Sequence, residues 1–524
     1  MRIDDSRRLF GPNLECGGPA AIAEVFFEPG EDADAALARW RTAAASVVDA
    51  GRLHLRRFRG GAALTIAGQL DELLPLCDVN EAAIAGVVDV AAQRAALAAA
   101  VDPALRRLLH AARAHGAPAL VDDTSVSLGL GKRAVVLPRA GVDAPVDWSA
   151  VGRIPVVLVT GTNGKTTTAR LLARIAAETG TVVGLATTDG LHAGGVVLAT
   201  GDYTGPDAAR TILRHPAVEL AVLETARGGI LRRGLAVDRA DVSVITNVSA
   251  DHLGLYGIDD VETMGRVKRV VGSVADRVVT NADDALTRGP FPGRATTFGL
   301  AHPADWTVVD GAVARRGEPV MALADIPIAF GGWARHNVAN ALAAAAAAEA
   351  LGIAWDAVRR GLAGFSAADN PGRSNLMEVG ATRVLLDFGH NLDGVRAVLG
   401  LAEALGARRL HVVLALPGDR DDEAIAAVAR AVAAARPARV AVHDLADYLR
   451  GRQPGAVPAL IAAELERSGI DPASIERSES EVDGLTRALD RAGAGDLVLV
   501  FPHLEREAVA ALLAARGGRP AGSS

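Results

Sequence analysis

The stretch Val159-Thr160-Gly161-Thr162-Asn163-Gly164-Lys165-Thr166-Thr167-Thr168 decides the fold. Its first residue, Val159, is the last of a short apolar run at residues 154–159. This run lacks polar alternation, as expected of a parallel strand covered on both faces. Residues 166–179 then have the pattern of a helix. Because a strand, a glycine-rich turn and a helix in this order make one βα unit, the sequence predicts an α/β fold with a parallel sheet.

The turn in this stretch has the composition of a phosphate site. Gly161 and Gly164 let the backbone approach a bound group closely, and the N–H groups at the helix start favour an anion. Lys165 adds a mobile positive charge, and the Thr166 hydroxyl is placed to ligate Mg²⁺. The loop is the short G-x-x-G-K-T form, because Val159 stands where the common P-loop has its first glycine. The alternative is a turn that binds nothing.

The chain beyond this loop alternates strands with helices in two blocks. Strands are predicted at residues 181–186, 218–223, 242–246 and 277–280, and again at 383–388, 410–416, 439–442 and 497–501. We expect three domains: an N-terminal domain at 1–150 that closes in a linker at 128–146, a central domain at 151–370, and a C-terminal domain at 371–524. Ligands should lie at the carboxyl ends of the parallel strands.

Composition narrows the classes of function. The net charge of −7 over 524 residues gives no sign of a nucleic-acid-binding surface. The charged N-terminus has no apolar signal core behind it, and no apolar tract is long enough to span a bilayer. Cys16 and Cys77 form neither a metal-spaced cluster nor a disulfide framework. We expect a cytoplasmic protein that acts on small molecules and binds neither nucleic acid nor membrane.

Five later strings accompany the phosphate loop. They are Thr187-Thr188-Asp189-Gly190, Gly201-Asp202-Tyr203-Thr204-Gly205-Pro206, Leu223-Glu224-Thr225-Ala226-Arg227-Gly228-Gly229-Ile230-Leu231, Thr246-Asn247-Val248-Ser249-Ala250-Asp251-His252-Leu253-Gly254 and Asn370-Pro371-Gly372-Arg373. As an ordered set they resemble the Mur ligase superfamily, which includes the UDP-muramoyl amino-acid ligases, folylpolyglutamate synthases and cyanophycin synthetases. The cyanophycin synthetase version is the most similar, from about residue 150 onward.

This resemblance implies a fold and an activity. The fold is a central P-loop parallel-sheet domain, a C-terminal Rossmann-like α/β domain and a smaller α+β N-terminal domain. The activity is ATP- and Mg²⁺-dependent formation of an amide between a carboxylate acceptor and an amino acid or other amine, through an acyl phosphate. Cyanophycin synthetases also carry an ATP-grasp domain, which we do not expect here, because about 150 residues precede the Mur part. The opening Arg8-Leu9-Phe10-Gly11-Pro12-Asn13 faintly resembles the start of their N-terminal domain.

The resemblance also implies roles for individual residues. ATP phosphates would be held by the loop, namely Gly161, Thr162, Asn163, Gly164, Lys165, Thr166 and Thr167. Mg²⁺ would be held by Thr166, Glu224 and His252. The simpler alternatives are an ion pair between Glu224 and Arg227, and a structural role for His252. Lys268 would be a catalytic residue, carbamylated in many Mur ligases; its alternatives are a solvated lysine or a cation facing phosphate.

Residues from the later part of the chain are expected to complete the nucleotide site. Asn337 would touch adenine, with helix capping as the alternative. Arg373 would reach the phosphates, Asp387 would hold the ribose, and His390 would approach the phosphates or the acyl phosphate. These contacts require the two domains to close on each other, so we expect an open–closed cycle.

Substrate contacts are predicted more loosely. The acceptor would meet Thr188, Asp189, Asp202, Thr204, Arg227 and Gly228. The amine would meet loops that contain Asp419 and Asp444, whose charge would favour a basic amino acid such as arginine; the alternative is that these are exposed loop acids. The sequence leaves open a Mur-type ligase of another specificity (polyglutamylation or a cell-wall precursor), a non-catalytic nucleotide-binding partner, and a homodimer or homotetramer.

Overall fold

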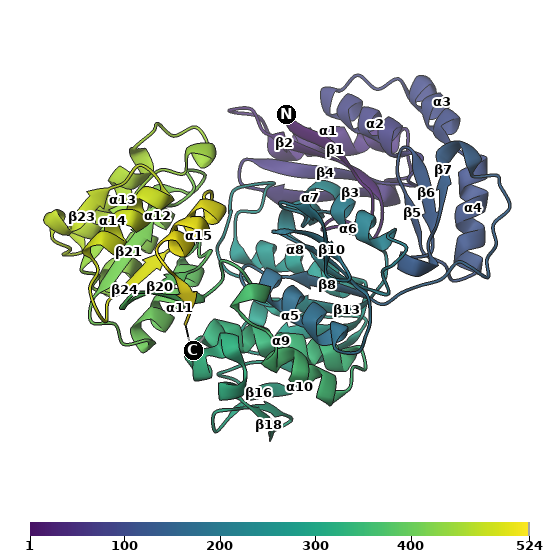
Figure 1. Cartoon of the computed structure of the whole chain (residues 1–524). Helices are drawn as coiled ribbons and strands as arrows, with labels where there is room; N and C mark the ends of the chain where they lie inside the picture. Colours follow the sequence, from purple (N-terminus) through teal and green to yellow (C-terminus); the bar gives the residue numbers. More distant parts are fainter. Residues whose placement is uncertain (522–524) are drawn as a thin grey trace. The chain divides into compact units, whose positions relative to one another are not determined.

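The computed structural model describes residues 1–521 (Figure 1); residues 522–524, the end of the predicted third domain, lie outside the described part. The chain divides into two compact units. The first holds Met1–Thr307 with Leu342–Gly361, and the second holds Val308–Ala341 with the chain from Leu362 onward. No helix among the described residues is long and apolar enough to cross a membrane.

The first unit begins with an antiparallel sheet in the order β1-β2-β4-β3. Its strands are β1 Arg2–Leu9, β2 Ala20–Phe26, β3 Leu53–Phe58 and β4 Gly61–Ala67. Helices α1 (Ala33–Ala45) and α2 (Leu73–Ala85) pack beside it (Figure 1). Buried Trp40 of α1 donates its Nε1–H to Asn80 of α2 at 2.8 Å. The N-terminal part is therefore α+β, as the sequence predicts.

A second, smaller sheet follows in the order β5-β6-β7. Its elements are β5 Ala119–Val121, β6 Ser125–Leu128 and β7 Val135–Pro138, preceded by helices α3 Val90–Ala100 and α4 Pro103–Ala114. The stretch at 128–146, expected as a linker, thus contains a paired strand, because β7 hydrogen-bonds along β6.

The main sheet of the first unit carries parallel strands in the order β9-β12-β8-β13-β14-β15. These strands are β8 Val156–Thr160, β9 Val183–Thr187, β12 Leu220–Glu224, β13 Ala240–Ile245, β14 Ala275–Asn281 and β15 Arg294–Phe298. An antiparallel hairpin, β10 Gly190–Ala193 with β11 Val196–Thr200, extends the β9 edge. Strand β16 (Trp306–Val309) follows β15. The predicted parallel sheet is confirmed.

The helices of this part are α5 Lys165–Ala177, α6 Pro206–Leu213, α7 Arg227–Arg233, α8 Val261–Ser273, α9 Arg335–Ala350 and α10 Trp355–Ala363. Helix α9 crosses the boundary between the two units. Leu158 and Leu223 on the strands share one buried cluster with Ile212 of α6 and Ile230 of α7. The βα alternation read from the sequence is therefore realised as helices packed on a parallel sheet.

The second unit contains a hairpin, β17 Ala312–Arg315 with β18 Glu318–Ala322, and a sheet in the order β23-β22-β21-β24-β20-β19-β25. The strands of this sheet are β19 Asn375–Val379, β20 Thr382–Leu386, β21 Leu410–Leu414, β22 Arg439–Val442, β23 Ile475–Arg477, β24 Leu497–Val500 and β25 Arg519–Pro520. Its helices are α11 Leu392–Ala404, α12 Asp422–Ala434, α13 Ala456–Arg467, α14 Glu481–Arg491 and α15 Arg506–Ala515. The neighbouring strands β20-β24-β21-β22-β23 are all parallel, which confirms a Rossmann-like arrangement.

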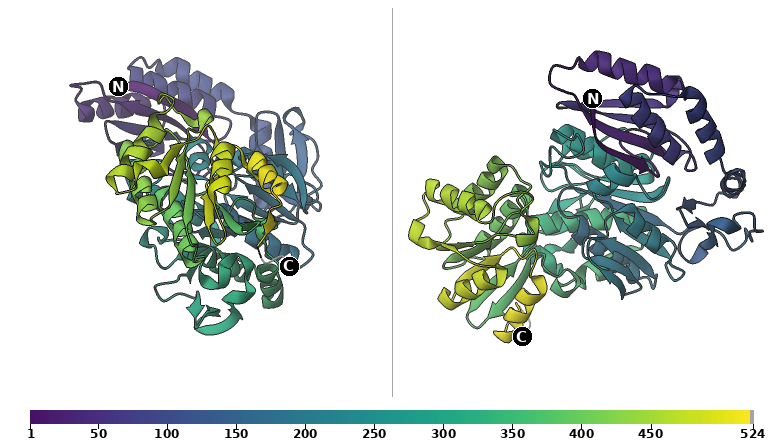
Figure 2. Two further views of the ribbon diagram at one scale, coloured as in Figure 1. Left: turned by 60° about the vertical axis from the view of Figure 1, so that its left-hand side comes forward. Right: turned by 90° about the horizontal axis from the view of Figure 1, so that it is seen from above.

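Within the first unit, β1 lies against α7, and Figure 2 shows the purple N-terminal strands beside the teal part of the chain. The Nε–H of Arg7 donates to Leu231 O at 3.1 Å, and the Phe10 amide donates to Arg233 O at 2.7 Å. The Leu235 amide in turn donates to Pro12 O at 2.8 Å. The last carbonyls of a helix have no partner within the helix, so residues of the N-terminal sheet cap α7.

Candidate active site

The phosphate loop connects buried β8 to α5. Gly161 has φ +152°, and a Cβ added there would lie 1.8 Å from the Thr246 hydroxyl oxygen. Gly164, the residue before the helix, has φ +82°. Both positions therefore require glycine, one for space and the other for its left-handed backbone.

The loop is held by the segment after β13. The Thr246 hydroxyl donates to Asn163 O at 2.6 Å, and the Asn163 amide donates to Asn247 Oδ1 at 2.9 Å. The Ser249 amide donates to the Thr162 hydroxyl oxygen at 2.9 Å. The sequence contained this Thr-Asn-x-Ser string as a family motif, but its role in shaping the loop was not predicted from residue types.

Glu224 ends β12 beside the start of α5 and is only 3% exposed. The Thr166 hydroxyl donates to its Oε2 at 2.8 Å, and the Thr188 hydroxyl donates to its Oε1 at 2.9 Å. The Thr188 amide also points to Oε2, at 3.2 Å. These hydroxyl and amide donors hold the Glu224 carboxylate at the start of α5.

Two lysines lie near the carboxyl ends of these parallel strands. Lys165 Nζ donates to Thr162 O at 2.9 Å, so its ammonium group folds over the loop. Lys268 of α8 is 3% exposed. Burial, followed by the positive charge of Lys165, lowers the pKa of Lys268 well below its ordinary value, while Asp251 and Asp284 oppose that shift. The solvated-face alternative for Lys268 is excluded by its burial.

Two of the predicted metal ligands are in contact, since the Thr166 hydroxyl donates to Glu224 Oε2 at 2.8 Å. The third, His252, has its Nε2 atom 3.9 Å from Asp251 Oδ1 and a backbone φ of +52°, and its role at the metal stays a prediction. Residues 1–521 contain no group of three or more His, Cys, Asp or Glu side chains placed to hold a metal. The hydroxyl and carboxylate oxygens of Thr166 and Glu224 nevertheless fit Mg²⁺, which keeps several waters and binds phosphate oxygens as further ligands.

The predicted acceptor residues have defined local partners. Asp189 forms an ion pair with Arg170 of α5, with Oδ2 3.2 Å from Nη2 and both side chains almost buried. Asp202 Oδ1 accepts from the Thr204 amide and hydroxyl at 3.1 and 2.7 Å. Both carboxylates thus brace loops beside the site. Arg227 and Gly228 begin α7.

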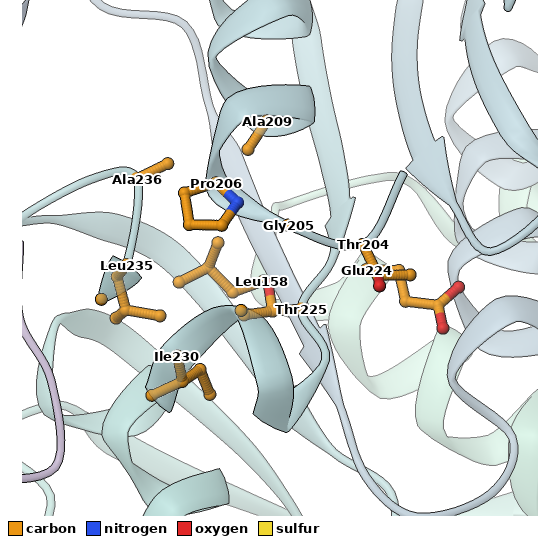
Figure 3. A pocket seen from close by; sticks show the side chains of 12 residues that line it. Leu158, Thr204, Gly205, Pro206, Ala209, Glu224, Thr225, Ile230, Leu235 and Ala236 are labelled. Atoms are coloured by element: carbon orange, nitrogen blue, oxygen red, sulfur yellow. The ribbon is translucent and has the colours of Figure 1, made fainter. Parts of the chain in front are cut away.

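A small pocket lies between α6 and α7. Its lining joins Thr204 and Glu224 to apolar side chains that include Pro206, Ile230 and Leu235. Figure 3 shows these apolar groups gathered together, while the Glu224 carboxylate is turned away from them. The Glu224 side chain therefore lies between the apolar lining of this pocket and the polar phosphate loop.

The predicted nucleotide residues of the second unit are already engaged locally. Asn337 is 2% exposed; its Nδ2 donates to Ile328 O at 3.1 Å, and its Oδ1 accepts from Asn340 at 3.3 Å. Asp387 accepts from the Ser374 amide at 2.7 Å and hydroxyl at 3.0 Å. These bonds are internal to the second unit, so the adenine and ribose roles stay predictions.

Two arginines and two histidines surround Phe388 at the carboxyl end of β20. The guanidinium carbons of Arg373 and Arg506 lie 5.1 and 4.2 Å from its ring centroid. The rings of His390 and His503 lie 5.4 and 5.0 Å away. Arg506 and His503 were not predicted from the sequence, because only the sheet topology brings the end of β24 beside the end of β20.

The two acidic residues predicted for the amine also have local partners. Asp444 Oδ2 accepts from the Gly455 amide at 2.6 Å. Asp419 Oδ1 lies 3.8 Å from Arg420 Nε. His443, next to Asp444 in the chain, is buried, and this burial lowers its pKa to about 4. These contacts test neither the roles nor the predicted preference for a basic amine.

Two family models match the chain. Residues 159–348 match the Mur ligase middle domain, and residues 372–504 match the Mur ligase, glutamate ligase domain. The chain belongs to the Mur ligase family. The cyanophycin synthetase of Crocosphaera subtropica is 39% identical over 68% of the chain, but the match covers 43% of that protein. The Mur-type chain therefore spans less than half of that relative's length.

Two solved structures have a similar fold. E. coli FolC in complex with ADP gives a TM-score of 0.52 at 21% identity, over 69% of this chain and 90% of FolC. A bifunctional folylpolyglutamate synthase/dihydrofolate synthase with Mn, AMPPNP and L-glutamate gives 0.53 at 19% identity, over 69% and 89%. At these identities the likeness concerns the fold alone. It agrees with the Mur ligase fold predicted from the motifs.

Proposed function

We propose that this Mur ligase family member joins an amino acid or another amine to a carboxylate acceptor, with hydrolysis of ATP to ADP and phosphate. The observation that carries the proposal is the bonded set Thr166–Glu224–Thr188 beside the phosphate loop and Lys165. A loop that only filled a turn would not need a buried carboxylate at the first helical turn.

The proposed reaction has two transfers. An oxygen of the acceptor carboxylate attacks the γ-phosphorus of ATP, the bond to the β-phosphate oxygen breaks, and ADP leaves. The nitrogen of the neutral amine then attacks the acyl phosphate carbon, the carbon–phosphate oxygen bond breaks, and an amide and phosphate form. The amine gives up one proton. Both steps depend mainly on positioning and charge neutralisation.

The chain's own residues supply these effects in the proposal. Loop N–H groups and Lys165 bind the phosphates, and the Thr166 and Glu224 oxygens would hold Mg²⁺. When bound, Mg²⁺ supplies positive charge to the phosphate oxygens. Two proteins of similar fold support these ligands: E. coli FolC was solved with ADP, and the folylpolyglutamate synthase/dihydrofolate synthase was solved with Mn, AMPPNP and L-glutamate.

Lys268 has two proposed roles. The lowered pKa favours its neutral amine, which is the form that reacts with CO₂ to give a carbamate. Left unmodified, it would be a buried group beside Lys165 that faces phosphate. Carbon-13 NMR of protein incubated with labelled CO₂ distinguishes the two, because only a carbamate gives a signal that is lost in Lys268→Met.

Phosphate release from ATP tests the proposed function. The purified chain is assayed with Mg²⁺, pooled amino acids and pooled small carboxylates, and active pools are then split into single compounds. We expect release that needs both an acceptor and an amine and that falls to background in Lys165→Ala. Release that no pair of compounds raises, and that Lys165→Ala does not change, would leave a nucleotide-binding partner protein as the better interpretation.

A further inference from the structure

Three guanidinium groups surround one aromatic ring where the N-terminal sheet meets α6 and α7. The Cζ atoms of Arg8, Arg210 and Arg233 lie 5.2, 5.3 and 6.0 Å from the centre of the Phe10 ring. We call these four residues the Phe10 cluster. Cations over an aromatic face are favourable, but three like charges around one ring repel each other unless negative charge is nearby.

The carboxylates near the Phe10 cluster are loosely placed. Asp123 lies 3.6 Å from Arg8 and its side chain is 80% exposed. Asp207 lies 3.8 Å from Arg210 and is 83% exposed. Such exposed pairs contribute little. A third carboxylate, Asp122, acts on Arg210 by its charge but is bound at 2.5 Å by Arg214, a fourth arginine of this region.

Arg210 is the strongest indication of a ligand. The residue is 7% exposed, and its Nε–H has no hydrogen-bond acceptor among the described residues. Burying a charged donor without an acceptor is unfavourable, so such groups in folded proteins need an explanation. An anion between the exposed Arg233 and the half-exposed Arg8 would supply the missing negative charge.

The Phe10 cluster and the candidate active site lie near opposite ends of α7. Helix α7 starts at Arg227, whose charge acts on Lys268, and ends at Arg233. Seven helical residues span about 10 Å. On α6, Arg210 directly follows Ala209, which lines the pocket that also includes Glu224 (Figure 3). The cluster and the Glu224 side of the site are thus separated by about the length of one short helix, a distance that an elongated small molecule spans.

We infer that the Phe10 cluster binds a second negatively charged group, a carboxylate or a phosphate, on the acceptor whose other carboxylate is amidated. The N-terminal residues Arg8 and Phe10 would thus form part of the acceptor site, which gives residues 1–150 a role in substrate selection. That the bound molecule is the acceptor rests on the proposed function; the anion site itself does not.

Calorimetric titration of two small anions tests this site without turnover. Glutarate and inorganic pyrophosphate are titrated into the full chain carrying Lys165→Ala, which weakens binding of the probe at the phosphate loop. We expect at least one probe to bind, with affinity that falls as salt is raised. Added Arg210→Gln should weaken binding at least about tenfold, as expected for loss of a charge-assisted hydrogen bond.

Matched variants separate the site from general charge effects. Arg233→Gln changes an exposed member of the cluster, so it should fold even if Arg210→Gln does not, and it should also weaken binding. Arg41→Gln removes an exposed arginine of α1 and should leave affinity unchanged. Equal affinity in Arg233→Gln and Arg41→Gln, or no binding of either probe, would overturn the site.

The assays for this inference and for the proposed function can fail separately. Anion binding is measured without ATP, whereas ligase activity is measured as phosphate release. If activity is found with acceptors that carry one carboxylate only, and Arg233→Gln leaves their KM unchanged, the role in acceptor selection is wrong while the ligase proposal stands. If acceptors with two acidic groups are preferred, the Arg233→Gln variant should raise their KM more than it lowers kcat.

Discussion

At the scale of single residues, the candidate site depends most on Glu224. Its carboxylate is buried and accepts hydrogen bonds from Thr166 and Thr188, so its position is set before any ligand arrives. A carboxylate held in this way beside a phosphate loop is suited to hold a metal ion. Its charge, rather than its shape, is therefore the property to test.

Replacing Glu224 by Gln should keep the size of the side chain and remove its charge. We expect ATP turnover to fall about 100-fold or more, the usual effect of removing one electrostatic group from an active site. Phosphate release at several Mg²⁺ concentrations measures this. Glu219→Gln changes a half-buried carboxylate paired with Lys132 and serves as the control; a similar loss in both variants would argue against a role in catalysis.

Lys268 should make stability depend on pH. Because its folded pKa lies below the ordinary value of 10.5, the unfolded chain binds the extra proton between these two values. The free energy of unfolding should then rise with pH in that window by about 1.4 kcal/mol per pH unit. Below the folded pKa, Lys268 is protonated in both states, so this slope should be zero.

Urea unfolding in CO₂-free buffer, from about pH 7 to about pH 9, measures that slope. The slope contributed by Lys268 should be absent in Lys268→Met. Lys132→Met, which removes an exposed lysine, should keep the wild-type slope. Parallel curves for wild type and Lys268→Met would mean that Lys268 is charged in the folded protein.

At the scale of elements, α7 is held at its end by the N-terminal sheet. Arg7 bonds Leu231 O and also pairs with buried Glu24, with Nη2 and Oε1 2.6 Å apart. Since α7 starts at Arg227 beside the candidate site, the cap at one end fixes the residues at the other. One connection from the N-terminal strands to the site therefore runs through this short helix.

Arg7→Met should be strongly destabilising. It leaves the Glu24 carboxylate buried without its cation, which typically costs about 3–5 kcal/mol, and it frees a helix-end carbonyl. Chemical unfolding measures the loss. Arg2→Met removes an arginine that is 61% exposed and should cost less than about 0.5 kcal/mol. Adding Glu24→Gln to Arg7→Met should recover part of the loss; if it does not, the ion pair is not the cause.

At the scale of the whole molecule, residues 1–150 belong to the same compact unit as the phosphate loop. Arg56 bonds Gly257 O at 2.6 Å and Tyr256 O at 3.3 Å, which adds a second attachment besides Arg7. We predict that the N-terminal sheet and the central sheet unfold together. Hydrogen exchange followed by mass spectrometry should give β2 and β8 the same protection; early exchange of β2 alone would show independent unfolding.

The central βα pattern was predictable because local rules determine it. Apolar runs such as residues 154–159 make buried strands wherever they occur, and the glycine-rich turn announces its helix. The motifs also identified Lys165, Thr166 and Glu224, which the structure brings to one end of the sheet. The β10–β11 hairpin was missed, although Gly194 and Gly195, both with positive φ, form its two-residue turn and Gly-Gly is a known hairpin signal.

The sequence by itself determined the phosphate loop, the alternation of strands and helices, and the Mur ligase resemblance, because these depend on short-range spacing. Only the tertiary structure decided that Asp189 pairs with Arg170, that Lys268 is buried, and that Phe10 lies among three arginines. Each of these depends on contacts between residues far apart in the sequence, and the resulting charge or burial depends on which elements the sheet order places side by side.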